Sequence, residues 1–524
     1  MPNINDLMSK IINASTFEST KSGETKEYAL KKEFTVPEYL PEISSVLRVN
    51  ADIGKSAKFI NGDNAEYSGQ VIYRIVYLDP ENLPRALSLS SQFDHQSDIG
   101  ALGDATVIFK PSVSGVRYTL TSPRKIELSS TVTMESDVIT TSSIDIKNDD
   151  DLRLEKLCRD VVNREIKCYG TDNCIQKGEF EIPSDMPSIG KILNCTAFCS
   201  VIAAKCTNDG TDISINVAIN LLYLSEESEN EAPSLQYYKT SLPFEIKIEN
   251  ENGGGGECEC FCTASIGDID ISADIDTFGS MRIVDISLGV NVRCISAQNK
   301  IISVCEDAFS EECDVLLKTD KIECRKLLKN TVSNFSDSIT LRAANDGIDK
   351  VLDVYVKPKV TEKRAKQNGI AVGGSFKVYA LIKTQSGEIV SLEEEKPFSY
   401  ECDCAGITPS GTPDILCDFS TLKVTHKNDS SKVKVDYDLS VSLMVFCKSE
   451  EEYISSVSKG DAAYSASVGA SSDLKIYYPD PDETLWSIAK RHHVSTDKII
   501  SANSLPKDTK KRDTIGKERK IILL

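Results

Sequence analysis

The feature that most constrains the fold of this chain is an internal repeat. The pattern F-x-[VI]-P-x-x-[LM]-P-x-I-x-x-[VI]-L occurs at Phe34–Ala51 and again, 146 residues later, at Phe180–Ala197. A third copy, at Ile348–Val354, lacks the two prolines but aligns its first isoleucine with Ile189 and its leucine with Leu193. A period of this length indicates several copies of one domain along the chain.

Each copy continues with runs in which Val, Ile, Tyr and Thr alternate with polar residues. Such alternation is typical of half-buried β-strands. The runs are Gln70–Leu78, Asp212–Leu224 and Ser375–Lys383 within the copies, and Lys125–Glu135, Met281–Cys294 and Lys432–Cys447 at their ends. We therefore predict a mainly β chain with three tandem antiparallel β-sandwich-like repeats. The segment Leu152–Ile166 fits either a helix or a strand–turn–strand.

These landmarks divide the chain into six parts. We expect an N-terminal extension at 1–25, β repeats at 26–147, 148–312 and 313–460, a linker at 461–475, and a different domain at 476–524. The linker is expected because its residues are small and polar.

Composition excludes several classes of function. The 60 Lys and Arg against 80 Asp and Glu give a net charge of −20, whereas nucleic-acid and anionic-membrane binding need a basic surface. No apolar run reaches the ~18–20 residues of a transmembrane helix, and the first residues lack a secretory signal, so we expect a cytoplasmic protein. The chain has four histidines and no converging acid and base groups, so we expect neither an enzyme nor a cofactor.

The chain is rich in cysteine, with 17 residues that all lie between Cys158 and Cys447. Without an export signal, these thiols are expected to be reduced. The runs Cys258-Glu259-Cys260-Phe261-Cys262 and Cys402-Asp403-Cys404 place thiols on one face of a strand. There they could chelate a metal, cross-link after cell lysis, or pack as small apolar residues. Zinc favours C-x₂₋₄-C pairs, so packing is preferred and no metal is expected.

The segment after the linker differs in charge and in period. Residues 476–524 carry ten Lys and Arg against seven Asp and Glu, a net +3, which leaves −23 for the rest of the chain. Thr484 is predicted to cap a first helix, and Ser495 or Thr496 a second. Two short strands are predicted to flank the helices, at Ile476–Tyr478 and Ile521–Leu523.

This segment resembles a LysM domain. The family pattern G-D-T-L-W-x-I-A is matched at Asp482–Ala489, with Asp482 and Glu483 in the first two places, and V-[ST] and N-x-L follow at Val494-Ser495 and Asn503–Leu505. LysM domains bind N-acetylglucosamine of peptidoglycan or chitin in a shallow groove. The resemblance implies that a groove for glycan or a partner is formed by Asp482, Glu483, Thr484, Asn503, Ser504 and Leu505.

Two further sets of residues are expected in this domain. Its core is predicted at Leu485, Trp486, Ile488, Ala489, Ile499 and Ile500. A basic patch that would steer an acidic partner is predicted at Lys507, Lys510, Lys511 and Arg512.

Three β repeats followed by one LysM domain resemble the SPOCS-domain spore-coat morphogenetic proteins of the SipL type in spore-forming Firmicutes. The resemblance implies a non-enzymatic scaffold in the mother-cell cytoplasm, at the forespore surface. Its LysM domain would dock coat layers by binding the polymerising ATPase of the coat basement layer, alongside other coat proteins. The alternative is a cell-envelope protein that binds N-acetylglucosamine of peptidoglycan. Neither function involves nucleic acid or membrane insertion.

Overall fold

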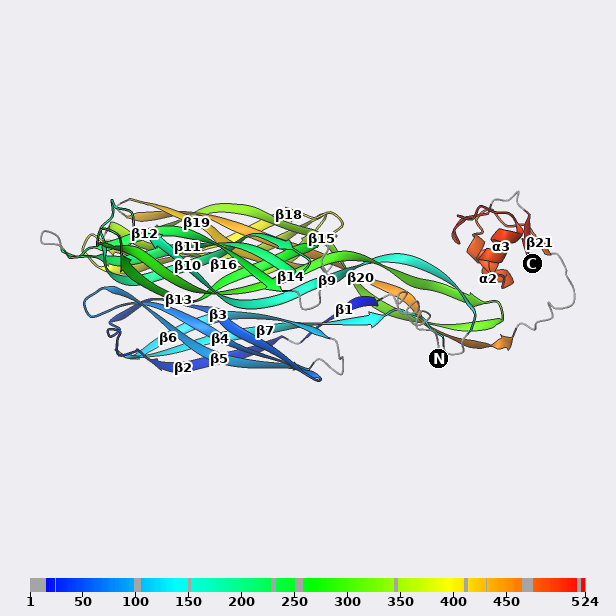
Figure 1. The fold of residues 1–524 in the computed structure, drawn as a ribbon, viewed down its shortest axis with the longest axis horizontal. Helices are drawn as coiled ribbons and strands as arrows, with labels where there is room; N and C mark the ends of the chain where they lie inside the picture. Colours follow the sequence, from blue (N-terminus) through cyan, green and yellow to red (C-terminus); the bar gives the residue numbers. More distant parts are fainter. Residues whose placement is uncertain are drawn as a thin grey trace.

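A computed structural model gives the fold (Figure 1), and it describes residues 16–23, 25–98, 105–148, 152–227, 232–249, 258–343, 347–409, 413–429, 431–463, 475–515 and 520–523. The predicted fold class is confirmed, because antiparallel β-sandwiches are followed by a small domain with two helices. No helix in these ranges is long and apolar enough to cross a bilayer.

Each repeat has a first sheet of three strands that starts at the repeated sequence pattern. In chain order, these strands are β3 (Ser45–Asn61), β4 (Asn64–Leu78) and β5 (Pro84–Asp98) in repeat 1; β10 (Ile189–Cys206), β11 (Gly210–Ser225) and β12 (Leu235–Glu249) in repeat 2; and β16 (Ile348–Lys366), β17 (Gly369–Thr384) and β18 (Ile389–Asp403) in repeat 3.

The second sheet of each repeat has the last strand of that repeat at its centre. It consists of β1 (Thr16–Ser22), β2 (Lys26–Thr35), β6 (Thr106–Ser122) and β7 (Lys125–Ser143) in repeat 1; β9 (Leu154–Glu181), β13 (Glu259–Ile275) and β14 (Met281–Ser310) in repeat 2; and β15 (Cys313–Arg342), β19 (Asp414–Asn428) and β20 (Lys432–Ala463) in repeat 3. The short β8 (Lys147–Asn148), between repeats 1 and 2, pairs with β20 in parallel.

The strand order is therefore the same in all three repeats, including the third, whose prolines are missing.

The segment at Leu152–Ile166 that fitted helix or strand is part of β9, because it pairs continuously with β14. Strand β1 falls within the expected N-terminal extension, yet it pairs along the same edge of β7 as β2 does. In repeat 1, β1 and β2 together occupy the position that the single long strand β9 has in repeat 2 and β15 has in repeat 3. Strand β20 runs to Ala463, into the expected linker.

The three first sheets meet at a shared apolar cluster. Leu47, Leu193 and Leu352 occupy the same place in the repeated pattern. Leu193 and Leu352 are buried in this cluster with Leu222 and Leu381 from the neighbouring strands, and the partly buried Leu47 packs against it. Burial of such side chains contributes ~1.5–3 kcal/mol each. The residues that mark the repeat in the sequence thus also hold the repeats together.

A polar contact lies beside this cluster. Arg48, Asn194 and Asp353 each follow one of the equivalent leucines, and all three side chains are buried. The Arg48 guanidinium donates to the Asp353 carboxylate at 3.3 Å, and the amide of Asn220 in β11 donates to the same carboxylate at 3.1 Å. The carboxylate of repeat 3 therefore receives hydrogen bonds from both other repeats.

Long strand extensions form a neck beyond the sandwiches. Strands β9, β14, β15 and β20 run past the sheets toward the C-terminal domain (Figure 1). Phe17 of β1 packs there with Val161, Val304 and Ile322. The neck is thus built from all three repeats, and its tip is the end of the paired strands β9 and β14, where Leu154 pairs with Ser310.

We expect Asp353→Ala to lower the free energy of unfolding by ~3–5 kcal/mol, because it leaves a buried guanidinium without its counter-charge. Asp349→Ala on the same strand is the matched control. Its carboxylate lies 4.0 Å from Lys383 and is 57% exposed, so its loss should cost ~0–1 kcal/mol. Urea unfolding followed by circular dichroism measures both.

Replacing both Arg48 and Asp353 by leucine should recover much of the lost stability, since the unpaired charge is then gone. Equal midpoints for the Asp353→Ala and Asp349→Ala chains would show that the repeats do not depend on this contact.

Candidate functional site

The C-terminal domain is held together by caps that its sequence supplies. Strand β21 (Lys475–Tyr477) pairs with β22 (Ile521–Leu523), and between them lie α2 (Leu485–His492) and α3 (Thr496–Ala502). The Thr484 hydroxyl accepts from the Ser487 amide, and the Ser495 hydroxyl accepts from the Lys498 amide. These bonds satisfy amides that the first turns leave free.

Of the six side chains expected in the LysM groove, most serve the fold of the domain. The Asn503 amide donates to Ile499 and Ile522 carbonyls at 2.9 and 2.8 Å, and so joins α3 to β22. Glu483 accepts from the Tyr477 hydroxyl at 2.6 Å and pairs with Arg491. Leu505 is buried in the core, and Thr484 caps α2.

The two remaining groove residues, Asp482 and Ser504, are exposed. Ser504 has a φ of 50°, whereas Asp482 is not among the described residues with positive φ. The aspartate that stands in place of the family's glycine therefore causes no left-handed strain.

The core of this domain continues into the neck. Leu485, Trp486, Ile488, Ala489 and Ile499 are buried and Ile500 is partly buried, and the same cluster contains Phe309 of β14 and Leu157 of β9. The rings of Trp486 and Phe309 have centroids 5.1 Å apart. The small domain thus packs an apolar face on the tip of repeat 2.

Asp307 is the central polar contact of this interface. A register shift in β14 lies between Cys305 and Asp307, and such bulges re-aim side chains. The Asp307 carboxylate accepts from the Trp486 indole at 3.0 Å and from the Lys490 ammonium at 2.6 and 2.7 Å.

A second carboxylate of this interface, that of Glu311, also contacts the small domain. Glu311 accepts from the backbone amide of Ser495 at 2.6 Å and from the Lys498 ammonium at 3.0 Å. These two donors outweigh desolvation, which alone would raise the pKa of Glu311, and hold that pKa below its ordinary value.

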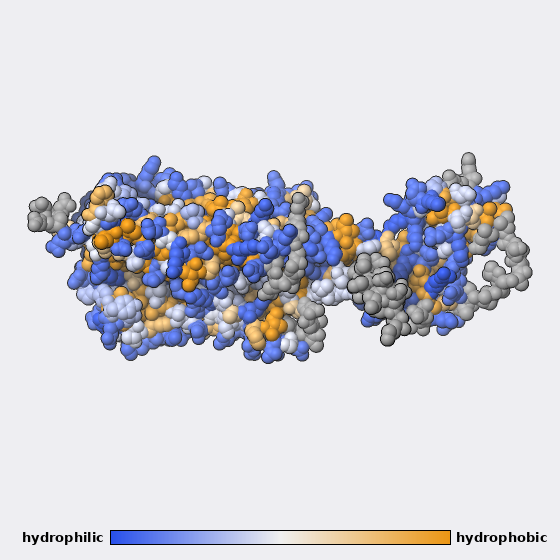
Figure 2. Space-filling view, in the orientation of Figure 1, coloured by the Kyte–Doolittle hydropathy of each residue, from blue (hydrophilic) through white to orange (hydrophobic). Residues whose placement is uncertain are grey.

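The predicted basic patch is divided by this interface. Lys511 donates to the Glu155 carboxylate at 3.0 Å, and Arg512 pairs with Glu306, so both contact the neck of their own chain. Lys507 and Lys510 are exposed. The sequence analysis expected the acidic groups that contact this patch to belong to a partner. For Lys511 and Arg512, repeat 2 of the same chain supplies them. On the face drawn in Figure 2, hydrophilic residues cover most of this lobe.

An activated thiol lies beside the interface. Cys158 of β9 is exposed and faces Cys305 across the paired strands. Its hydrogen bond with Cys305, aided by the ammonium groups of Lys156 and Lys511, lowers the pKa of Cys158 to about 6. The lowered pKa favours the thiolate of Cys158, which is the reactive form of cysteine.

We expect iodoacetamide to alkylate Cys158 with a pH–rate midpoint of about 6. Cys305→Ser should move this midpoint upward, because the hydrogen bond with Cys305 is the largest cause of the low pKa. Mass spectrometry of the labelled peptides measures the rate. A midpoint near the ordinary ~8.5 in the unaltered chain would contradict this assignment.

The structure corrects the expectation that all cysteines are reduced. Cys206 at the end of β10 forms a disulfide with Cys258, which precedes β13. The sequence did not suggest this pair, because 52 residues separate its members and only the packing of the two sheets brings them together.

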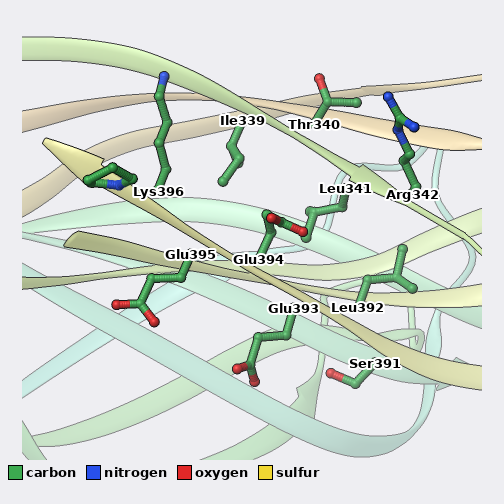
Figure 3. Close-up of a pocket in the computed structure, with 11 residues that line it drawn as sticks. Ile339, Thr340, Leu341, Arg342, Ser391, Leu392, Glu393, Glu394, Glu395 and Lys396 are labelled. Carbon is green, nitrogen blue, oxygen red and sulfur yellow. The ribbon is translucent and has the colours of Figure 1, made fainter.

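A groove of about 560 Å³ lies between the edge strands β15 and β18 of repeat 3 (Figure 3). Glu393, Glu395 and Lys396 line it, but each is engaged by another side chain: Glu393 with Lys377, Glu395 with Ser375, and Lys396 with Asp337. Glu394 and Arg342 line the same groove and are exposed.

Comparison with known families agrees with this architecture. The family model described as SipL, SPOCS domain matches residues 347–427, and the LysM domain model matches residues 481–509. No curated protein and no solved structure matched the chain. The SPOCS match covers β16 to most of β19 in repeat 3, and repeats 1 and 2 have the same strand order.

The chain therefore combines a SPOCS domain with a C-terminal LysM domain, and both families are non-catalytic binding domains. This is the combination found in the SipL-type proteins that the sequence resembles, which confirms that resemblance. The two domains fit a spore-associated protein that acts in the coat and binds the cell wall.

Proposed function

We propose that this protein is a non-enzymatic scaffold of spore-coat assembly. It acts in the mother-cell cytoplasm and docks coat layers to the forespore surface. Its LysM domain binds the polymerising ATPase of the coat basement layer, and its β repeats contact other coat proteins. The supporting observation is that one side of the LysM domain is fixed on the neck, while the loops that carry Asp482, Ser504, Lys507 and Lys510 are exposed.

The division of the basic patch sharpens this proposal. Lys507 and Lys510 are exposed and can attract an acidic partner, whereas Lys511 and Arg512 hold the LysM domain to Glu155 and Glu306. Charges at the rim of an interface act mainly on the association rate. The two halves of the patch should therefore differ in what they control.

We expect the double variant Lys507→Glu/Lys510→Glu to slow association of the full chain with the immobilised ATPase, most strongly at low salt. The matched variant Lys511→Glu/Arg512→Glu has the same change in charge but should instead release the LysM domain from the neck. Surface plasmon resonance measures association, and small-angle X-ray scattering measures the extension of the chain. An unchanged association rate in the first variant would remove Lys507 and Lys510 from the docking surface.

In sporulating cells, a fluorescent fusion that lacks residues 475–524 should no longer gather at the forespore surface. The repeats should stay folded, because each sandwich has its own core. Normal localisation of the truncated chain would overturn a docking role for the LysM domain.

The match to the LysM family supports a second function, binding of N-acetylglucosamine in peptidoglycan. Asp482 and Ser504 are the groove side chains that are free to contact a sugar. If purified sacculi pull down the full chain, chitin oligomers compete, and Asp482→Ala/Ser504→Ala weakens binding, then this second function holds.

A further inference from the structure

Five cysteines of repeat 2 converge at one end of its sandwich. Cys206 lies at the end of β10, and Cys258 immediately precedes β13. Cys260 and Cys262 lie at the start of β13, and Cys294 lies on the facing stretch of β14. The Sγ atoms of Cys206, Cys258 and Cys260 all lie within 4.8 Å of one another. Cys260 also has a hydrogen bond with Cys294.

The spacing of three of these sulfurs, those of Cys206, Cys258 and Cys260, suits a thiolate metal site, and the Cys294 sulfur lies outside this group but within hydrogen-bond reach of Cys260. Zn²⁺ binds cysteine sulfur at ~2.3 Å, which puts the sulfurs of a tetrahedral site ~3.8 Å apart. The C-x-C spacing of Cys258 and Cys260 lacked a partner pair in the sequence, and the fold supplies Cys206 from the other sheet and Cys294 from the neighbouring strand. We propose that the reduced chain binds one zinc ion through the thiolates of Cys206, Cys258 and Cys260, and that Cys294, the hydrogen-bonded neighbour of Cys260, moves in as the fourth ligand.

The surroundings can stabilise the charge of four thiolates. The Ser296 hydroxyl lies 3.3 Å from the Cys260 sulfur and 3.7 Å from the Cys294 sulfur, and the Cys262 thiol lies 2.9 Å from that of Cys294. The Ser296 hydroxyl is itself 3.1 Å from that of Thr211. Hydrogen bonds to coordinating atoms of this kind orient the ligands and tune the metal site.

The disulfide and the metal exclude each other, because the thiolate and not the disulfide sulfur is the ligand. A dithiol reductant transfers two electrons and two protons to the Cys206–Cys258 bond, opens it to two thiols and is itself oxidised to a disulfide. Zn²⁺ then replaces the protons of four thiols, so four protons leave as four Zn–S bonds form. Repeat 2 thus has an oxidised, metal-free state and a reduced, metal-binding state.

The site also bears on how the repeats are joined. Asn330 of β15 donates to the Cys260 carbonyl at 3.1 Å and to the Glu259 carboxylate at 2.9 Å. A metal held at Cys260 therefore fixes the start of β13 at the point where repeat 3 contacts it.

Titration of the full chain with Co²⁺ under anaerobic conditions tests the proposal. The chain reduced with dithiothreitol and then freed of it should bind one equivalent and develop the visible and sulfur-to-cobalt bands of tetrahedral thiolate coordination, which Zn²⁺ should abolish. The oxidised chain should give no such bands. This comparison uses one unaltered sequence, so folding of a variant cannot confuse it.

Cys206→Ser and Cys260→Ser should each remove the tetrahedral bands. Cys174→Ser is the matched control in the same repeat, since its sulfur contacts the Val290 carbonyl at 3.7 Å and should leave the bands intact. Absence of stoichiometric Co²⁺ binding to the reduced chain would overturn the proposal. Equal binding by the oxidised chain, or bands that survive in both Cys206→Ser and Cys260→Ser, would overturn it as well.

Discussion

The ion pair between Arg48 and Asp353 joins repeat 1 to repeat 3 beside the apolar cluster that all three repeats share. Both side chains are buried, and an isolated charge in such a place costs several kcal/mol. The pair is tolerated because Asn220 adds a further hydrogen bond and because the guanidinium lies over the ring of Tyr355 at 5.3 Å. Each repeat has its own core, yet the buried Asp353 carboxylate of repeat 3 is paired by repeat 1 and receives a further hydrogen bond from repeat 2.

The neck extends this dependence to the C-terminal domain. Its four long strands pack with β1, and its tip presents Glu155, Glu306, Asp307 and Glu311 to a domain of opposite net charge. The LysM domain therefore contacts the chain through one surface and can offer another to a ligand. Cys158, whose pKa depends in part on Lys511, lies beside this contact.

Much of the fold could be predicted from the sequence, because its signals are local. Period-two alternation located strands in all three repeats, and Thr484 and Ser495 marked the helix starts. The segment at Leu152–Ile166 stayed ambiguous because its partner strand lies more than a hundred residues away. The same reason hid the pairing of Lys511 with Glu155 and the approach of Cys206 to Cys258. Contacts between distant segments leave no periodic trace in a single sequence.

The junction also determines how far the three copies can be exchanged for one another. The positions of Arg48, Asn194 and Asp353 are equivalent in the repeat, yet one is cationic, one neutral and one anionic. Arg48 and Asp353 meet in this junction, so identical copies would place two like charges, or none, at their contact. The three repeats are therefore no longer interchangeable. Exchanging or replacing one of them would leave a charge at the junction without its partner in another repeat.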